Sequence, residues 1–295
     1  MLARFWGVTG TVSLPTPATG SPMPAGNTTC LGLEWPGRTV VYDAGTGFIR
    51  FGEYLLDLMA QGHEESRSID LIMSHCHLDH INGLLFSPLT YDKRVRITLR
   101  ACPATLSALH KLLDPSSSSC RTFLPSTFPD MVAIKEMVTV EPGSSFNLGD
   151  AKVETMALRH PGGSLGFRVS LGGLSMVLAS DNEHPGPGVD PALARFSEGA
   201  QVLYTEGQYT RREYDGLDAI GNGLPMPRKG WGHSTMEDCV ATATAAGCQR
   251  LFLGHHDPLR PLDKLEALGM AMKDLAGRNG PLVEMAREGQ AIHLG

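Results

Sequence analysis

Four potential metal ligands fall within six residues of this chain, at positions 75 to 80, and no other feature constrains fold and function as much. This motif reads His-Cys-His-Leu-Asp-His and follows residues 69–73, an apolar run that predicts a buried strand. Because side chains alternate at a strand end, we expect His75 and His77 to point the same way, with Asp79 and His80 following as the chain turns. Imidazole and carboxylate groups suit Zn²⁺ or a similar transition metal. Two adjacent ions could share one water molecule and lower its pKa toward neutrality, which makes a hydroxide nucleophile.

Length, charge and cysteine usage limit the class of protein. A chain of 295 residues can bury a sizeable core, and we expect one domain over residues 1–295. The net charge is −6 and no stretch carries a long run of basic residues, which argues against an extensive nucleic-acid surface. No apolar run approaches the ~20 residues that span a bilayer, and the N-terminus lacks the apolar stretch of a signal peptide. The six cysteines form no Cys-x-x-Cys pair, so we expect a soluble, reduced, cytoplasmic protein without membrane contact.

Short apolar segments recur along the chain, with helical patterns between several of them. The predicted strands are residues 39–42, 69–73, 95–99, 153–158, 166–171, 174–179, 201–205 and 250–253. The predicted helices are residues 51–60, 103–113, 235–246 and 262–275. Residues 114–130, 182–191 and 207–232 are predicted to be long loops, with either a functional or a merely connecting role. Because strands occur in adjacent groups as well as alternating with helices, mixed sheets covered by helices are favoured.

Three further potential ligands each come just after a predicted strand. They are His160, Asp181 and His255, and each stands beside turn-forming residues. Any one of them alone is more often a hydrogen-bonded polar residue at a strand end. Together with the four in the motif they make a set that suits two metal ions. His256, next to His255, leaves open which of the two is the ligand.

The order of these residues resembles the metallo-β-lactamase superfamily. That family has a strand ending in Asp-x-Gly, then His-x-His-x-Asp-His, then a lone His, a lone Asp and a final His. Here the first of these elements is at Asp43, and the match extends over about residues 5–258. The resemblance implies the α/β class and an αββα sandwich, in which helices flank two mixed sheets and a dinuclear site lies at one edge.

The resemblance also implies a role for each candidate ligand. One ion is held by His75, His77 and His160, and the other by Asp79, His80 and His255, with Asp181 bridging the two. Asp43 is similar to a family carboxylate that orients a ligating imidazole. The family places its last ligand directly after the strand, which favours His255 and leaves His256 as a supporting or substrate contact. We expect two divalent ions; affinity alone favours zinc over manganese or iron.

Residues 232–235, Gly-His-Ser-Thr, resemble the His-Ser-Thr motif of ribonuclease Z and related phosphodiesterases. Ser234 or Thr235 can cap the helix that follows, with an acidic residue completing a capping box. His233 then lies at a helix N-terminus, where an anion such as phosphate is favoured. A protonated His233 could stabilise charge on the phosphoryl group or protonate the leaving alkoxide. The alternative is that His233 only packs at the helix entry.

Some positions resemble a bacterial branch of phosphodiesterase-like members, and others depart from it. Asn27 lies in one of the similar segments, and Arg50 is a candidate phosphate contact. Thr9 stands near a position where related chains tend to carry Arg, and Glu206 stands where they tend to carry Asp.

These features together predict a dinuclear metal-dependent hydrolase that cleaves phosphodiester bonds, with Asp79 and His233 as the catalytic residues. We expect a small or cyclic nucleotide-like substrate, because no insertion has the length and basic charge of the arm with which ribonuclease Z grips RNA. One alternative is a hydrolase of the same fold that acts on a lactone, thioester or β-lactam. Another is a non-catalytic sensor that binds a nucleotide through its metal ions. The oligomeric state is not predicted.

Overall fold

The computed structural model describes residues 1–14, 26–62, 66–116, 122 and 124–295, and it contains two mixed β-sheets. The first has the order β14-β1-β2-β3-β4-β5-β6 and is parallel from β3 to β6. Its strands are β1 (Leu2–Gly7), β2 (Cys30–Trp35), β3 (Arg38–Tyr42), β4 (Arg67–Ile72), β5 (Val95–Ala101), β6 (Ile134–Thr139) and β14 (Ala291–His293).

The second sheet has the order β13-β12-β11-β10-β9-β8-β7 and is parallel from β10 to β13. Its strands are β7 (Ser145–Leu148), β8 (Ala151–Leu158), β9 (Ser164–Leu171), β10 (Leu174–Ala179), β11 (Val202–Glu206), β12 (Arg250–Gly254) and β13 (Leu282–Met285). The two sheets face each other across a buried cluster that includes Phe5 and Tyr42 from the first and Phe167 and Tyr204 from the second.

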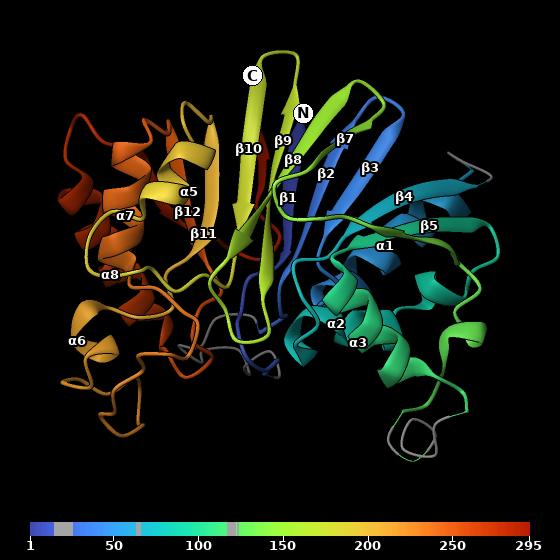
Figure 1. Cartoon of the computed structure of the whole chain (residues 1–295), viewed down its shortest axis with the longest axis horizontal. Helices are drawn as coiled ribbons and strands as arrows, with labels where there is room; N and C mark the ends of the chain where they lie inside the picture. Colours follow the sequence, from blue (N-terminus) through green and yellow to red (C-terminus); the bar gives the residue numbers. More distant parts are fainter. Residues whose placement is uncertain (15–25, 63–65, 117–121, 123) are drawn as a thin grey trace.

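Helices cover the outer face of each sheet (Figure 1). The first sheet is covered by α1 (Gly47–Ala60), α2 (Leu78–Phe86) and α3 (Pro103–Leu113), and the second by α5 (Pro191–Phe196), α7 (Met236–Ala245) and α8 (Leu262–Ala276). The short helix α6 (Arg211–Tyr214) and the 3-10 turns η1 (Pro88–Tyr91) and η2 (Phe128–Asp130) lie in connections. The predicted αββα sandwich is therefore confirmed. No helix within the described ranges has the length and apolar character to cross a membrane.

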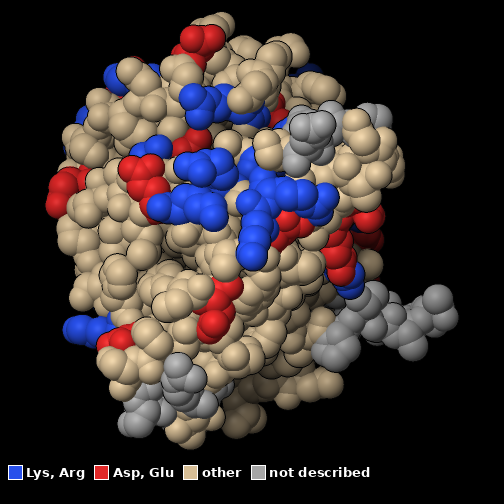
Figure 2. Space-filling model, turned by 90° about the vertical axis from the view of Figure 1, so that its right-hand side faces the viewer, with Lys and Arg blue, Asp and Glu red and all other residues tan. Residues whose placement is uncertain are grey.

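Alternation along β5 shows how the layers form. Val95, Ile97 and Leu99 pack under the helices, whereas Arg96 and Arg100 face the other way and line a cavity, with the Arg100 guanidinium over the ring of Phe146 in β7. Figure 2 shows Lys and Arg side chains gathered on this side of the molecule. Arg38, Arg96, Arg100 and Lys135 are the basic residues that line a cavity of about 320 Å³ there.

Two of the predicted loops need correction. The segment 207–232 contains α6, because Thr210 and Glu213 form a capping box that closes one helical turn. The segment 114–130 ends in η2, and its residues 117–121 and 123 lie outside the described residues. The segment 182–191 has no helix or strand before Pro191, as predicted.

Parallel strands end together at one edge of each sheet, at the bottom of Figure 1. The ends of β3 and β4 in one sheet therefore meet the ends of β10, β11 and β12 in the other. Side chains that follow these strands converge on the edge of the sandwich.

Candidate metal centre

The side chains of the site lie at strand ends, and several of these residues have an uncommon backbone conformation. Asp43 follows β3, Asp181 follows β10 and His255 follows β12, with φ angles of 57°, 58° and 50°. Thr11, in the loop after β1, has φ 67°, and these four are the non-glycine residues of the described chain with positive φ. Such a conformation costs about 1–2 kcal/mol per residue. The backbone strain of the described chain is thus concentrated around one site.

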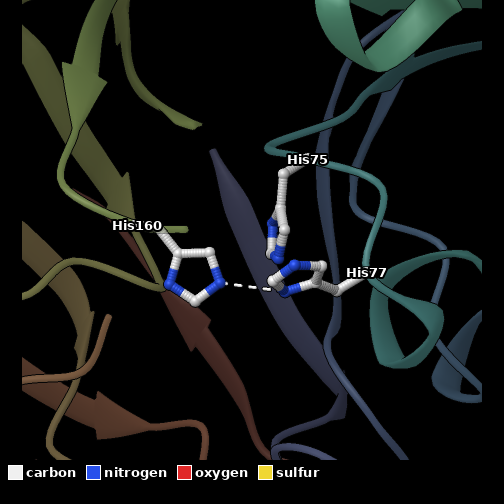
Figure 3. Close-up of side chains that lie close together, drawn as sticks. All are labelled: His75, His77 and His160. Carbon is white, nitrogen blue, oxygen red and sulfur yellow. Dashed lines mark hydrogen bonds between the residues drawn. The ribbon is translucent and has the colours of Figure 1, made fainter. Parts of the chain in front are cut away.

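Three imidazoles form the first group of ligand atoms (Figure 3). His75, His77 and His160 bring one nitrogen each within 4.8 Å of the others, and His160 Nε2 lies 2.9 Å from His77 Nδ1. His75 and His77 point the same way, as expected, with ring centroids 4.5 Å apart. The buried His75 Nε2 has no hydrogen-bond partner. A buried imidazole nitrogen that has no hydrogen-bond partner and lies among other imidazoles fits the role of a metal ligand.

The second group combines a carboxylate with two imidazoles. Asp79, His80 and His255 also bring ligand atoms within 4.8 Å of one another. His255 Nε2 lies 3.2 Å from Asp79 Oδ2 and 3.4 Å from His80 Nε2. The backbone N–H of Thr11 donates to the same Asp79 oxygen at 2.7 Å, which fixes the direction of that carboxylate.

Asp181 lies between the two groups. Its Oδ1 is 3.3 Å from His80 Nε2, and its Oδ2 is 3.4 Å from His255 Nε2. The same Oδ2 is 3.6 Å from His160 Nε2 and 3.7 Å from His75 Nε2. Asp181 therefore contacts members of both groups, which is the position that a bridging carboxylate requires.

The electrostatics of the cluster favour a cation. Burial and the neighbouring imidazoles lower the pKa of His75 and His77, which keeps them in the neutral form that binds metals. Although burial opposes ionisation, the facing histidines lower the pKa of Asp79 and Asp181, so both are anions. Burial also lowers the pKa of His80, but nearby carboxylates outweigh it and raise that pKa. A metal ion would occupy the same negative potential.

Neighbouring groups orient the ligand rings. Asp43 Oδ2 lies 2.8 Å from His80 Nδ1, and the carboxylate of Asp43 accepts the N–H and O–H of Ser74 at 2.7 Å each. His160 Nδ1 donates to the carbonyl of Gly232 at 2.9 Å. In both rings these contacts occupy Nδ1 and leave Nε2 facing the cluster. The contact between Asp43 and a candidate ligand is the one expected from the sequence.

His233 lies beside the cluster and is paired with a buried carboxylate. Its ring stacks on His255 with centroids 5.0 Å apart, and its Nδ1 lies 2.6 Å from Glu206 Oε2. Burial alone would lower the pKa of His233, but the charge and hydrogen bond of Glu206 raise it to about 9. The other oxygen of Glu206 accepts the N–H of Asn182 at 2.5 Å. His233 is therefore a protonated group held with Nε2 free of Glu206, which suits proton donation.

Sequence reasoning assigned no role to two residues of this site. Glu206 ends β11, so the rule that flagged polar residues at strand ends in the other cases applies to it as well. Thr11 contributes its backbone N–H from a left-handed conformation, and no pattern of side chains signals that.

The structure distinguishes the two adjacent histidines. His255 joins the ligand cluster, whereas His256 Nε2 donates to the carbonyl of Ala286 at 2.9 Å. Burial lowers the pKa of His256 to about 4. His256 thus supports the loop and is not a member of the cluster.

Other candidates make contacts outside the cluster. The amide of Asn27 donates to Glu288 at 2.6 Å, and Arg50 pairs with Glu53 at 2.9 Å on the exposed side of α1. These contacts do not support the suggested roles of Asn27 and Arg50 at the site, because each side chain is directed to a carboxylate elsewhere.

The predicted helix cap is formed by Thr235, whose hydroxyl accepts the N–H of Asp238 at 3.2 Å. The reciprocal half of a capping box is not seen, because the Asp238 carboxylate instead accepts from Gly188 and Arg211. Ser234 is buried and donates to the carbonyl of Asn182. Both residues therefore position the segment that carries His233.

Two cavities open onto the cluster and meet at His233, which lines both of them. The smaller, about 250 Å³, is lined by Thr11, His77, Leu78, Asp79, Asp181, His233 and His255. The larger, about 580 Å³, lies between the loops after β8 and β10, α6 and the start of α7. A ligand can therefore touch the metal-binding groups and extend past His233.

Comparisons with known proteins agree with this architecture. Residues 38–256 match the family described as a β-lactamase superfamily domain. No curated protein sequence matches the chain significantly.

Among solved structures, Zn²⁺-bound PqqB from Methylobacterium extorquens has a TM-score of 0.69 at 15% identity, with 100% of both chains covered. A diphosphatase from the PhnP family has a TM-score of 0.64 at 17% identity, and the match covers 99% of this chain and 97% of that chain. The short form of human tRNase Z has a TM-score of 0.62 at 17% identity, with 100% of both chains covered. At these identities the likeness shows a shared fold.

Proposed function

The chain belongs to the β-lactamase superfamily, and we propose that it is a metal-dependent hydrolase that cleaves phosphodiester bonds. The observation that carries the proposal is the His233–Glu206 pair beside a cluster of candidate ligands. Cleavage of a phosphodiester with a basic leaving alcohol benefits from a neighbouring group that is protonated at neutral pH and can donate to the leaving oxygen, and this pair supplies one. Hydrolysis of a lactone or a β-lactam also releases a basic group that takes up a proton, so the comparison of substrates below decides between these reactions.

The residues present fit two divalent ions. We propose His75, His77 and His160 for one, Asp79, His80 and His255 for the other, and Asp181 between them. Nitrogen and carboxylate donors suit zinc, with manganese or iron as alternatives. When bound, such ions supply a water molecule of lowered pKa and neutralise charge on the phosphoryl oxygens.

The chain's own residues then orient the attacking water and protonate the leaving oxygen. Asp79, aligned by the N–H of Thr11, accepts a proton from the attacking water or holds that water in place. Water attacks phosphorus, the bond from phosphorus to the leaving alcohol breaks, and His233 gives its proton to the leaving oxygen. Glu206 keeps His233 protonated before this step and stabilises its orientation.

The substrate that we propose is a small or cyclic phosphodiester. The larger cavity has a volume of about 580 Å³, which is within the range of ordinary small-molecule sites. The diphosphatase and the tRNase Z among the structures of similar fold support phosphoryl chemistry in this superfamily, although their identity to this chain is low.

The first test is to measure metal content and hydrolysis in the same purified samples. The substrates are bis-p-nitrophenyl phosphate, a diester with an alkyl leaving group, a lactone and a thioester. We expect about two metals per chain and cleavage of both diesters. His233→Ala should keep its metal and lose far more activity on the alkyl diester than on the aryl one, because p-nitrophenolate leaves without a proton. Cleavage of the lactone or thioester alone would show that the reaction is misassigned.

A further inference from the structure

The larger cavity begins where the leaving group of a diester would be. His233 gives its proton to the leaving oxygen in the proposed reaction, and it lines both this cavity and the smaller one that holds Asp79 and Asp181. A substrate with its phosphorus near the two aspartates therefore has its leaving alcohol on the side of the larger cavity.

One wall of this cavity is a turn that Glu183 holds in place. The Glu183 carboxylate accepts the backbone N–H groups of Gly230 and Gly232 at 2.7 and 2.8 Å, and also the hydroxyl of Tyr214. A Cβ on Gly232 would lie 2.2 Å from His160 Nδ1, so the close approach requires glycine there. Lys229 directly precedes Gly230 in this turn and lines the cavity.

Two of the basic residues around the cavity are paired with carboxylates, whereas Lys229, Asp215 and Glu183 have no partner of opposite charge within the described residues. Arg211 pairs with Asp238, and Arg159 is 3.2 Å from Asp190. Within the described residues no carboxylate pairs with Lys229. Asp215 also lines the cavity without a basic partner in the described chain, so any preference for an anion depends on Lys229 itself rather than on a general positive field.

His184 adds an unused acceptor. It is 8% exposed, and its Nε2 is buried without a hydrogen-bond partner. Its Nδ1 lies 3.4 Å from the carbonyl of Gly188, which places the proton of the neutral ring on Nδ1. Nε2 is then a buried acceptor without a partner in a residue that lines the cavity.

We propose that this cavity binds the leaving half of the substrate, and that this half carries a second phosphate group, which Lys229 contacts. The inference rests on the proposed phosphodiesterase function and names its substrate class: a diester whose leaving alcohol is a sugar phosphate or a similar hydroxyl-bearing phosphate. Hydrolysis transfers the diester phosphoryl group to water and releases this alcohol with the proton from His233. The second phosphate is not altered.

The test uses three substrates that differ only in terminal phosphate: dithymidine phosphate and its 5′- and 3′-phosphorylated forms. Whichever half leaves, one of the two phosphorylated forms carries its extra phosphate on that half, and the products identify it. We expect this form to be preferred over dithymidine phosphate by roughly tenfold in kcat/KM, mostly through KM. The preference should weaken with salt, because Lys229 is exposed.

Variants separate this reading from a general effect of charge. Lys229→Met should remove the preference, Lys229→Arg should keep part of it, and Asp215→Asn should increase it. Lys264→Met removes another exposed lysine, on α8, and should change nothing. Equal rates for all three dinucleotides, or a preference that survives Lys229→Met, would overturn the inference.

Bis-p-nitrophenyl phosphate, measured alongside, distinguishes the two proposals. If it is cleaved while the dinucleotides show no preference or no reaction, only the leaving-half assignment fails. If no diester is cleaved by protein with its metals bound, the proposed function and this inference fail together.

Discussion

Replacing Glu206 with Gln should move the alkaline limb of the pH–rate profile to lower pH. Glu206 Oε2 lies 2.6 Å from His233 Nδ1, and the pKa of His233 is raised from an ordinary 6.5 to about 9 despite burial, through the charge and hydrogen bond of Glu206. At 1.36 kcal/mol per unit, this difference corresponds to about 3 kcal/mol in favour of the protonated ring. A proton donor with a raised pKa is active below that pKa, and its activity is lost as the pH rises through it.

Glutamine removes the charge but keeps an oxygen that can accept the N–H of Asn182, so the fold around the site should persist. We expect the midpoint of the alkaline limb to fall by roughly 1–2 units. Bound divalent ions would lower the pKa of His233 in both proteins, so the prediction concerns the difference between them.

The assay is kcat against pH with two diesters, one with an alkyl and one with a p-nitrophenyl leaving group. The limb should move clearly with the alkyl diester and hardly appear with the aryl one, since only the alkoxide needs a proton. Glu53→Gln, which removes an exposed carboxylate paired with Arg50, is the matched control. An unmoved limb in Glu206→Gln, with metal content and melting temperature unchanged, would refute the role of His233 as the proton donor.

Four further outcomes are expected. Chelation should lower the melting temperature and zinc should restore it, with about 2.7 kcal/mol of stabilisation per ion at a free concentration 100 times its Kd; an unchanged melting curve would speak against bound ions. Asp43→Asn should weaken metal binding by roughly 10- to 100-fold in a chelator competition, because the carboxylate orients His80. His255→Ala should lose metal while His256→Ala keeps it, and the reverse result by metal analysis would exchange their roles. Gly232→Ala should destabilise the fold by more than about 1 kcal/mol in denaturant unfolding, since its φ is 90° and the new methyl group would collide with His160.

Much of the fold could be predicted because the central strands carry continuous apolar runs. Strand β10 was predicted with its observed bounds, and β8 and β12 to within two residues at each end. Six strands of the described chain were missed. The edge strands β6, β7, β13 and β14 are partly exposed, and Arg, Gly or Glu interrupts the apolar residues of the interior strands β1 and β2. Helix α2 was missed because it begins inside the ligand motif at Leu78, where polar side chains interrupt the helical pattern.

The candidate ligands could be found because each lies in a local pattern of strand, polar residue and turn. The same approach did not assign Glu206 to the site, because its meaning depends on contact with His233, 27 residues away. Asn27 and Arg50, which were selected by segment likeness or charge, contact carboxylates outside the cluster. Sequence pattern therefore shows which groups reach an edge of the sheet, whereas their pairing requires the tertiary structure.

The strained backbone explains how the sandwich holds this chemistry. Asp43, Asp181 and His255 lie directly after or close to a strand end and have a left-handed backbone conformation. This conformation turns each side chain toward the edge of the sandwich, whereas an extended backbone would direct it away. At about 1–2 kcal/mol for each of these residues and for Thr11, the left-handed conformation costs several kcal/mol in total. The packing of buried apolar side chains elsewhere in the fold must offset this cost. Burial adds a separate electrostatic cost, because the carboxylates of Asp43 and Asp181 are removed from water and share His80 as a contact. A cation bound at this edge would stabilise those buried negative charges, so metal binding would offset part of the cost that these residues impose on the folded chain.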